Sequence, residues 1–116
     1  MSTNGKMKGK EGELELARIL REHGYSEARR SQQFNGKAGD ADIVGALEGI
    51  HIECKRVENL NIYNAIDQAK RDAKDGNIPT VFHRRNRKEW LVTMQMEEWL
   101  KLYGKAHDSE AEKGSD

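Results

Sequence analysis

The stretch from Gly39 to Arg56, GDADIVGALEGIHIECKR, constrains the fold more than any other part of the sequence. Two short apolar runs flank the pair Glu48-Gly49, which favours a turn between two strands. In the second run, apolar Ile50, Ile52 and Cys54 alternate with polar His51, Glu53 and Lys55. Successive side chains on a strand point to opposite faces, so this alternation predicts a β-hairpin with one face in the core.

A two-residue loop at Glu48-Gly49 would set the pairing of the two strands. Asp42 then faces Lys55 and lies diagonal to Glu53. The expected core face consists of Ile43, Gly45, Leu47, Ile50, Ile52 and Cys54. The opposite face brings two carboxylates and an ammonium group together. They form either a solvated ion pair worth less than about 1 kcal/mol or a site for a hard cation such as Mg²⁺, and the hairpin leaves both interpretations open.

The rest of the chain alternates between helical and extended patterns. The expected helices are Lys8–Gly24, Asn61–Asp75 and Met96–Tyr103, and the expected strands are Ala28–Phe34, Asp42–Leu47, Ile50–Lys55, Thr80–His83 and Trp90–Thr93. This α-β-β-β-α-β-β-α order predicts an α/β fold with a mixed β-sheet flanked by helices. We expect residues 1–6 to be disordered, 7–104 to form one domain and 105–116 to be a flexible acidic tail.

Charge is distributed unevenly although it sums to zero, with 20 Lys and Arg against 20 Asp and Glu. Basic residues crowd the segment HRRNRK at His83–Lys88 and the segment KMKGK at Lys6–Lys10. Such patches can contact nucleic-acid phosphates, or they can be a solvated hairpin and a flexible start. Overall charge alone therefore does not indicate a nucleic-acid partner.

Several protein classes are disfavoured by what the sequence lacks. No apolar run reaches the roughly 20 residues that span a bilayer, and the N-terminus lacks the apolar segment of a signal peptide. The single cysteine, Cys54, cannot form an internal disulfide, and its alternation with Ile52 indicates a buried structural thiol. The four histidines show no zinc-type spacing. We expect a cytoplasmic protein with no membrane partner.

One acidic residue falls on the apolar side of the first helix. At 100° per residue, Glu13 projects with Leu16, Ala17 and Leu20, whereas Glu11 points to the opposite side. A buried acid is costly unless it is paired or bound to a cation. Glu13 is therefore a candidate cation ligand, or it faces solvent and favours the helix N-terminus.

Three blocks in order resemble the PD-(D/E)XK nuclease superfamily: K-G-x-x-x-E at Lys8–Glu13, G-x-x-D-I at Gly39–Ile43 and I-E-C-K at Ile52–Lys55. Within it, the chain is most similar to the small Holliday-junction resolvases of archaea and phages, over about residues 7–103. The resemblance implies a restriction-endonuclease-like fold and a Mg²⁺-dependent DNA endonuclease, with Mn²⁺ able to replace Mg²⁺. Ala41 stands where the superfamily usually has a proline before the motif aspartate.

The resemblance also implies residue roles. Glu13, Asp42 and Glu53 correspond to acidic metal-site residues, and Lys55 corresponds to the catalytic lysine. Gln68 resembles a glutamine often found on the helix after the E-x-K strand, or it is a surface residue of that helix. The candidate DNA-binding residues are Lys8, Lys10, Arg56, His83, Arg84 and Arg85.

Likeness to resolvases implies a homodimer acting on branched DNA, because two symmetric cuts need two active sites. The final helix is apolar around much of its circumference, at Trp99, Leu100, Leu102 and Tyr103. It is either a dimer interface or an end cap on its own sheet. Two other functions stay open: a nicking or repair endonuclease of the same superfamily, and a non-catalytic DNA-binding or assembly protein with the same fold.

Overall fold

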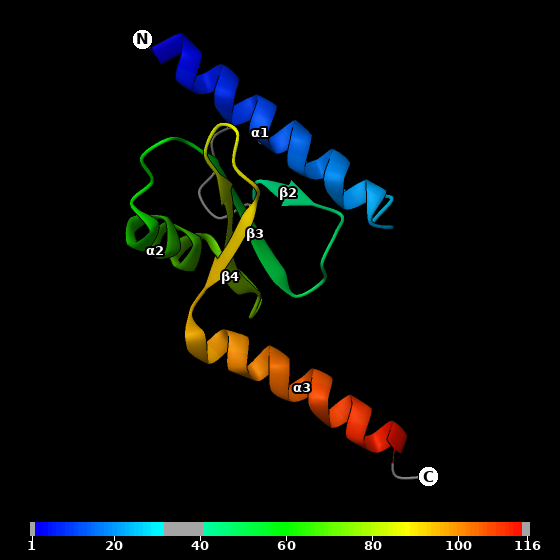
Figure 1. The fold of residues 1–116 in the computed structure, drawn as a ribbon. Coiled ribbons are helices and arrows are strands. Elements are labelled where there is room, and N and C mark those ends of the chain that lie inside the picture. The colour runs from blue at the N-terminus through cyan, green and yellow to red at the C-terminus, as the bar shows by residue number, and fades with distance from the viewer. Residues whose placement is uncertain (1, 32–40, 115–116) are drawn as a thin grey trace.

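The computed structural model describes residues 2–31 and 41–114, which form helices on both faces of one sheet (Figure 1). The elements are α1 (Ser2–Glu22), β1 (Arg29–Arg30), β2 (Ile43–Val44), β3 (Ile50–Arg56), α2 (Ile62–Asp72), β4 (Ile78–Arg84), β5 (Leu91–Met94) and α3 (Met96–Gly114). The predicted element order and α/β fold class are confirmed.

The sheet is mixed, with the strand order β1-β2-β3-β4-β5. Strands β3 and β4 run parallel, and the other neighbouring pairs are antiparallel. Parallel strands need a crossover connection, which α2 provides here. In the β3–β4 register, Lys55 lies beside His83 and Arg56 lies beside Arg84. The sheet therefore brings the end of the E-x-K strand next to the basic segment that follows β4.

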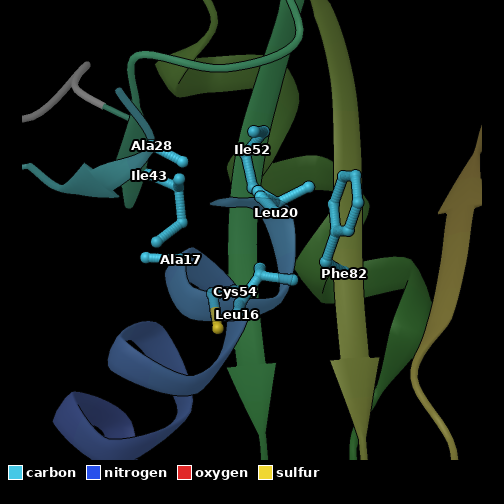
Figure 2. Packing of buried hydrophobic residues seen from close by; sticks show 8 residues of the cluster. All are labelled: Leu16, Ala17, Leu20, Ala28, Ile43, Ile52, Cys54 and Phe82. Atoms are coloured by element: carbon cyan, nitrogen blue, oxygen red, sulfur yellow. The ribbon is translucent and has the colours of Figure 1, made fainter. Parts of the chain in front are cut away.

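Helix α1 covers one face of the sheet with the apolar stripe expected from its spacing. Leu16, Ala17 and Leu20 are buried there. They cluster with Ala28, which directly precedes β1, and with the sheet residues Ile43, Ile52, Cys54 and Phe82 (Figure 2). Each fully buried aliphatic side chain contributes roughly 1.5–3 kcal/mol relative to an exposed one. This packing fixes α1 so that Glu13, three residues before Leu16, lies on the same side of the helix.

Helix α2 covers the opposite face. Its buried Ala65 and Ala69 pack with Val81 of β4. The helix begins after Asn61, whose side-chain oxygen accepts a hydrogen bond from the Asn64 N–H at 3.1 Å. Glu53 lies beside Val81 in the β3–β4 register. The Glu53 side chain therefore points to the α2 side of the sheet, where it is only 2% exposed.

The hairpin confirms the predicted faces, but the predicted register is wrong. Ile43 pairs with Ile52, whereas the predicted register would pair it with Cys54. This shift of two residues keeps Ile43 and Ile52 in the core. It also places Asp42 near Glu53 instead of facing Lys55. Positive φ angles at Gly45 (78°), Leu47 (52°) and Gly49 (86°) make a wider turn than the expected two-residue loop. A Cβ at position 45 would collide with the Glu27 carbonyl, so this turn requires glycine there.

Several predicted boundaries also differ from the structure. Strand β1 is shorter than Ala28–Phe34, and residues 32–34 lie outside the described part of the chain. Helix α1 begins at Ser2, so residues 2–6, expected to be disordered, are helical. Helix α3 continues through Gly104 to Gly114, where a flexible tail was expected. The segment after Gly104 is rich in Lys, Ala and Glu, which are strong helix formers, and polarity alone does not end a helix.

Helix α3 runs away from the sheet instead of capping it (Figure 1). Its exposed apolar side chains include Met96, Trp99, Leu100 and Tyr103. Among the described helices, none has the length and hydropathy needed to cross a membrane.

Candidate active site

The candidate site lies where β2, β3 and α1 meet. Asp42 comes directly before β2, and its backbone N–H donates a hydrogen bond to the Ile52 carbonyl of β3 at 2.8 Å. Glu13 reaches the same place from α1, because both residues line a pocket of about 190 Å³ with Arg30, Ser31 and Ala41. Three segments that are distant in sequence therefore converge on Asp42.

Asp42 carries the strongest electrostatic signal of the site. Burial, followed by the negative charge of Glu53, raises the pKa of Asp42 from an ordinary value of 3.8 to about 7. The charge of Glu13 raises this pKa further, whereas the hydrogen bond from the Cys54 N–H and the charge of Lys55 lower it. Glu53, Glu13 and Lys55, the other members of the predicted set, thus each act electrostatically on Asp42.

Asp42 and Glu53 each form a hydrogen bond through one of their two carboxylate oxygens. Asp42 Oδ2 accepts a hydrogen bond from the Cys54 backbone N–H at 2.8 Å, and Glu53 Oε1 lies 2.7 Å from His51 Nε2. Within residues 2–31 and 41–114, Asp42 Oδ1 and Glu53 Oε2 make no hydrogen bond. Each carboxylate is therefore held through one oxygen and has the other available, which fits a hard cation that prefers carboxylate ligands.

Glu13 differs from these two carboxylates because its partner is a charged side chain. Its Oε1 accepts a hydrogen bond from Arg30 Nε at 2.8 Å, in a half-buried ion pair. No group of three His, Cys, Asp or Glu side chains in the described part of the chain is arranged as a complete cation site. The structure brings Asp42 and Glu53 together, but the metal-binding role of all three acids stays a prediction.

Lys55 and Gln68 differ in their relation to the carboxylates. Lys55 is half-buried on β3, and its charge acts on Asp42. Gln68 is half-buried on α2, and its side chain makes no hydrogen bond with the residues that the structure describes. Only Lys55 is therefore connected to the candidate site, and the catalytic role of Gln68 stays a prediction.

Cys54 contributes through its backbone. Burial, with the nearby charge of Asp42, raises the pKa of the Cys54 thiol far above its usual value. The thiol is therefore unreactive, in agreement with the structural role predicted for it. Its backbone N–H instead fixes the orientation of Asp42.

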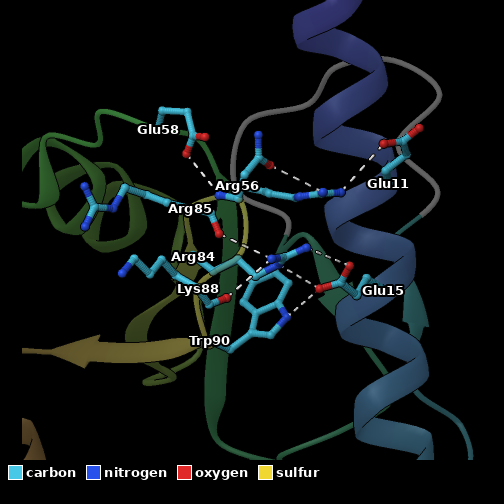
Figure 3. A network of polar contacts seen from close by, with 9 residues as sticks. Glu11, Glu15, Arg56, Glu58, Arg84, Arg85, Lys88 and Trp90 are labelled. Atoms are coloured by element: carbon cyan, nitrogen blue, oxygen red, sulfur yellow. Dashed lines mark hydrogen bonds and ion pairs between the residues drawn. The ribbon is translucent and has the colours of Figure 1, made fainter.

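Arg84 belongs to a network that joins α1 to β4 (Figure 3). Its Nε lies 2.8 Å from Glu15 Oε1, and the indole N–H of Trp90 donates a hydrogen bond to the same oxygen at 2.7 Å. The Arg84 guanidinium also lies over the Trp90 ring, 5.8 Å from its centroid. Burial alone would raise the pKa of Glu15, but the hydrogen bonds from Trp90 and Arg84 and the charge of Arg84 lower it overall.

Arg56 makes a second, weaker link to α1. Its Nη1 lies 3.6 Å from Glu11 Oε2, and its Nη2 donates a hydrogen bond to Asn86 Oδ1 at 3.5 Å. Gly12 allows this approach, because a Cβ there would lie 2.9 Å from the Arg56 Cβ. Like Arg84, Arg56 is therefore engaged in contacts within the chain.

The other predicted DNA-binding residues fall into two groups. Lys10 and Arg85 are exposed, and Figure 3 shows Arg85 and Lys88 pointing away from α1. His83 is half-buried, with Nε2 at 2.7 Å from Thr93 Oγ1, and burial lowers the pKa of His83. The Lys8 side chain lies outside the described part of the structure.

A groove lies beside these basic residues. It has a volume of about 490 Å³ and lies where β3 and β4 end. It is lined by Val57, Glu58, Asn59, Leu60, Ile62, His83, Arg84, Arg85, Lys88, Glu89 and Leu91. Since Lys55 is beside His83 in the sheet, the groove begins next to the E-x-K strand. Arg85 and Lys88 give the groove exposed cations that can contact a phosphate backbone. Glu58 and Glu89 also line it, whereas Asp42 and Glu53 do not.

Sequence reasoning missed several residues that shape the site. His51 was considered only for zinc-type spacing, although its position two residues from Glu53 on a strand places both on one face. Glu15 and Trp90 are 75 residues apart, and Glu13 and Arg30 are 17 apart. No local pattern in the sequence connects such pairs.

Comparisons with known proteins add one finding. The model of a protein family described as "Phage putative PDDEXK endonuclease" matches residues 4–113. Neither the curated proteins nor the solved structures gave a match.

Proposed function

The chain belongs to the phage PDDEXK endonuclease family that it matches over residues 4–113, and from this premise we propose that it hydrolyses DNA phosphodiester bonds with a divalent cation held by Asp42 and Glu53. The membership confirms the PD-(D/E)XK resemblance, and the mixed sheet agrees with the restriction-endonuclease-like fold. The observation that carries the proposal is the carboxylate pair, in which each acid has one oxygen held by the protein and one available.

The residues of the site divide the chemistry between them. Asp42 and Glu53 would hold Mg²⁺, with Glu13 as a further acid and Mn²⁺ as a substitute. When bound, the cation would stabilise the negative charge that develops on the scissile phosphate. Lys55 would orient the attacking water or offset charge on the phosphate. Water adds to phosphorus as the bond to the leaving sugar oxygen breaks.

Exposed basic residues in the groove and on α1 would supply much of the DNA affinity. Arg85, Lys88 and Lys10 are exposed and can neutralise phosphates, with release of counterions. Arg56 and Arg84 already have acidic partners on α1. DNA phosphates would compete with these acids, so we assign the two arginines mainly to holding α1 against the ends of β3 and β4.

We assign branched DNA as the favoured substrate and a homodimer as the active form. The likeness of about residues 7–103 to small Holliday-junction resolvases supports the substrate. The exposed apolar side of α3 supports the dimer. The reducing cytoplasm of a bacterium or of a phage-infected host cell is the proposed site of action.

The test is cleavage of a synthetic four-way junction beside linear duplex, flap and single-stranded DNA, with Mg²⁺, Mn²⁺ or a chelator. Asp42→Asn, Glu53→Gln and Lys55→Ala should each remove most cleavage and leave DNA binding intact. For Lys55→Ala we expect a loss of roughly 100-fold or more, which is typical for a group positioned at the reacting atoms. Asp67→Asn, an exposed acid on α2, is the matched control and should cleave normally. Nearly unchanged cleavage in all three variants would exclude this site.

A further inference from the structure

His51 and Glu53 form a buried pair on β3 that the proposed hydrolysis does not by itself require. The two side chains are 3% and 2% exposed, and His51 Nε2 lies 2.7 Å from Glu53 Oε1. An ionised carboxylate can only accept hydrogen bonds, so the imidazole Nε2 must donate. The contact thus fixes one oxygen of a residue that we assign to the cation site.

The surroundings of the pair make this hydrogen bond important. The buried side chains between the sheet and α2 include apolar Ala65, Ala69 and Val81, and Val81 lies beside Glu53 in the β3–β4 register. A buried carboxylate in such surroundings is unfavourable unless it is hydrogen-bonded or bound to a cation. Among the described residues, His51 is the only side chain that donates to Glu53. Without it, the carboxylate would be free to rotate.

We propose that His51 is a positioning residue for the divalent-cation site: its Nε2–H holds Glu53 Oε1 so that Oε2 stays available next to Asp42. Hydrogen bonds to a metal-binding carboxylate orient it before the cation binds. The inference rests on the proposed function, because it takes Asp42 and Glu53 as cation ligands.

Two amide substitutions separate positioning from general stability. In His51→Gln, the amide nitrogen can reach the place of the imidazole Nε2 and donate to Glu53. In His51→Asn, the same amide lies nearer the ring's Nδ1 position and falls short. Both variants keep a polar, uncharged side chain at a buried position, so they differ mainly in the reach of the donor.

The measurement is binding of Mn²⁺ to the full chain without DNA, followed by the electron paramagnetic resonance signal of free Mn²⁺. His51→Asn should weaken Mn²⁺ binding by about 10- to 100-fold, which is usual when a hydrogen bond to a metal ligand is lost. His51→Gln should retain most of the affinity. The control His23→Asn changes an exposed histidine at the end of α1 and should bind Mn²⁺ normally. A folded His51→Asn variant with wild-type Mn²⁺ affinity would overturn the proposal.

Asp42→Asn and Glu53→Gln separate this inference from the proposed function. If both lose Mn²⁺ binding and His51→Asn does not, the cation site is correct and the role of His51 is wrong. If all three bind Mn²⁺ as the wild type does, the cation site itself is wrong.

A measurement on the unaltered chain covers the case in which His51→Asn does not fold. The His51 Nε2 proton, observed by nuclear magnetic resonance, should shift when Mg²⁺ is added, and Glu53→Gln should abolish that shift. A signal unchanged at saturating Mg²⁺ would contradict the proposed coupling.

Discussion

The surroundings of Asp42 compensate its negative charge poorly. Its Oδ2 accepts one hydrogen bond, but burial and the adjacent charges of Glu53 and Glu13 oppose ionisation and raise its pKa to about 7. An ionised Asp42, buried beside two other acids, therefore lowers the free energy of unfolding near neutral pH. A cation between the two carboxylates would remove that cost, which gives a physical reason for the arrangement.

The raised pKa of Asp42 predicts how stability depends on pH in the absence of divalent cations. Between its ordinary pKa of 3.8 and its folded pKa of about 7, the folded state holds a proton that the unfolded state has lost. The contribution of Asp42 to the free energy of unfolding is therefore greatest below about 3.8 and falls as the pH rises to about 7. Urea unfolding at several pH values in this range should show that the free energy of unfolding declines less in Asp42→Asn than in the wild type, because asparagine stays neutral. Parallel curves for the two proteins would mean that Asp42 ionises normally.

Divalent cations should oppose this decline, because a cation binds the ionised form of Asp42. Adding Mg²⁺ should raise the free energy of unfolding of the wild type at pH 7.5 more than at pH 5. Asp42→Asn should show neither gain. An equal effect of Mg²⁺ on both proteins would point to binding elsewhere.

Glu13 and Glu11 provide a matched pair on one helix. Glu13 lines the pocket that contains Asp42, whereas Glu11 is exposed and lies near Arg56. Glu13→Gln should therefore reduce cleavage by about tenfold or more, as expected when a group that supports a metal ligand is lost, and Glu11→Gln should have a much smaller effect. Cleavage rates at saturating DNA would test this, and equal losses would show that Glu13 has no special place in the site.

Arg84 and Arg85 are adjacent in sequence but differ in their contacts. Of the two, Arg84 forms the ion pair with Glu15 that joins β4 to α1, and Arg85 is exposed. Arg84→Gln breaks the half-buried ion pair with Glu15 and should lower the free energy of unfolding by about 1–3 kcal/mol. Arg85→Gln changes an exposed side chain and should alter stability by less than about 0.5 kcal/mol. Arg85→Gln should instead reduce the salt dependence of DNA binding by about one slope unit, if Arg85 contacts one phosphate. Urea unfolding and DNA titrations at several salt concentrations would measure both effects, and the reverse assignment would contradict the structure.

The elements show what local sequence patterns can and cannot predict. The faces of the hairpin were predicted correctly because alternation along Ile50–Lys55 is a local property of a strand. The register was predicted incorrectly, because it depends on the turn that contains Gly45. That turn packs Gly45 closely against the Glu27 carbonyl, which belongs to a distant part of the chain. Likewise, spacing placed Glu13 on the buried side of α1, but it could not reveal that Arg30 would pair with it.

Across the whole molecule, the position of α3 is what its sequence least explains. The structure extends 60 × 30 × 28 Å along its principal axes. Helix α3 adds to its length, because it runs away from the sheet (Figure 1). Met96 and Tyr103 on this helix are 71% and 57% exposed. Trp99 stacks on Tyr103 with ring centroids 5.4 Å apart. Apolar side chains at positions 96, 99, 100 and 103 form one stripe along a helix, which is typical of a surface that pairs with another helix.

We therefore expect two copies of the chain to associate through α3. Light scattering at micromolar concentration should give about twice the mass of the 13.2 kDa chain. Trp99→Glu places a charge in the apolar stripe and should yield a monomer, because burying an unpaired carboxylate is unfavourable. Tyr25→Glu, an exposed aromatic at the end of α1, should leave the mass unchanged.

The consequence for cleavage distinguishes a junction resolvase from a simpler nuclease. Two symmetric cuts in a four-way junction require two active sites related by a two-fold axis. Trp99→Glu should therefore lose paired junction cleavage while it still nicks duplex DNA, since Asp42, Glu53 and Lys55 lie in one chain. Junctions labelled on both cleavable strands would report paired and single cuts separately. A wild-type monomer that nicks linear duplex as readily as junctions would exclude the resolvase and leave the nicking or repair endonuclease.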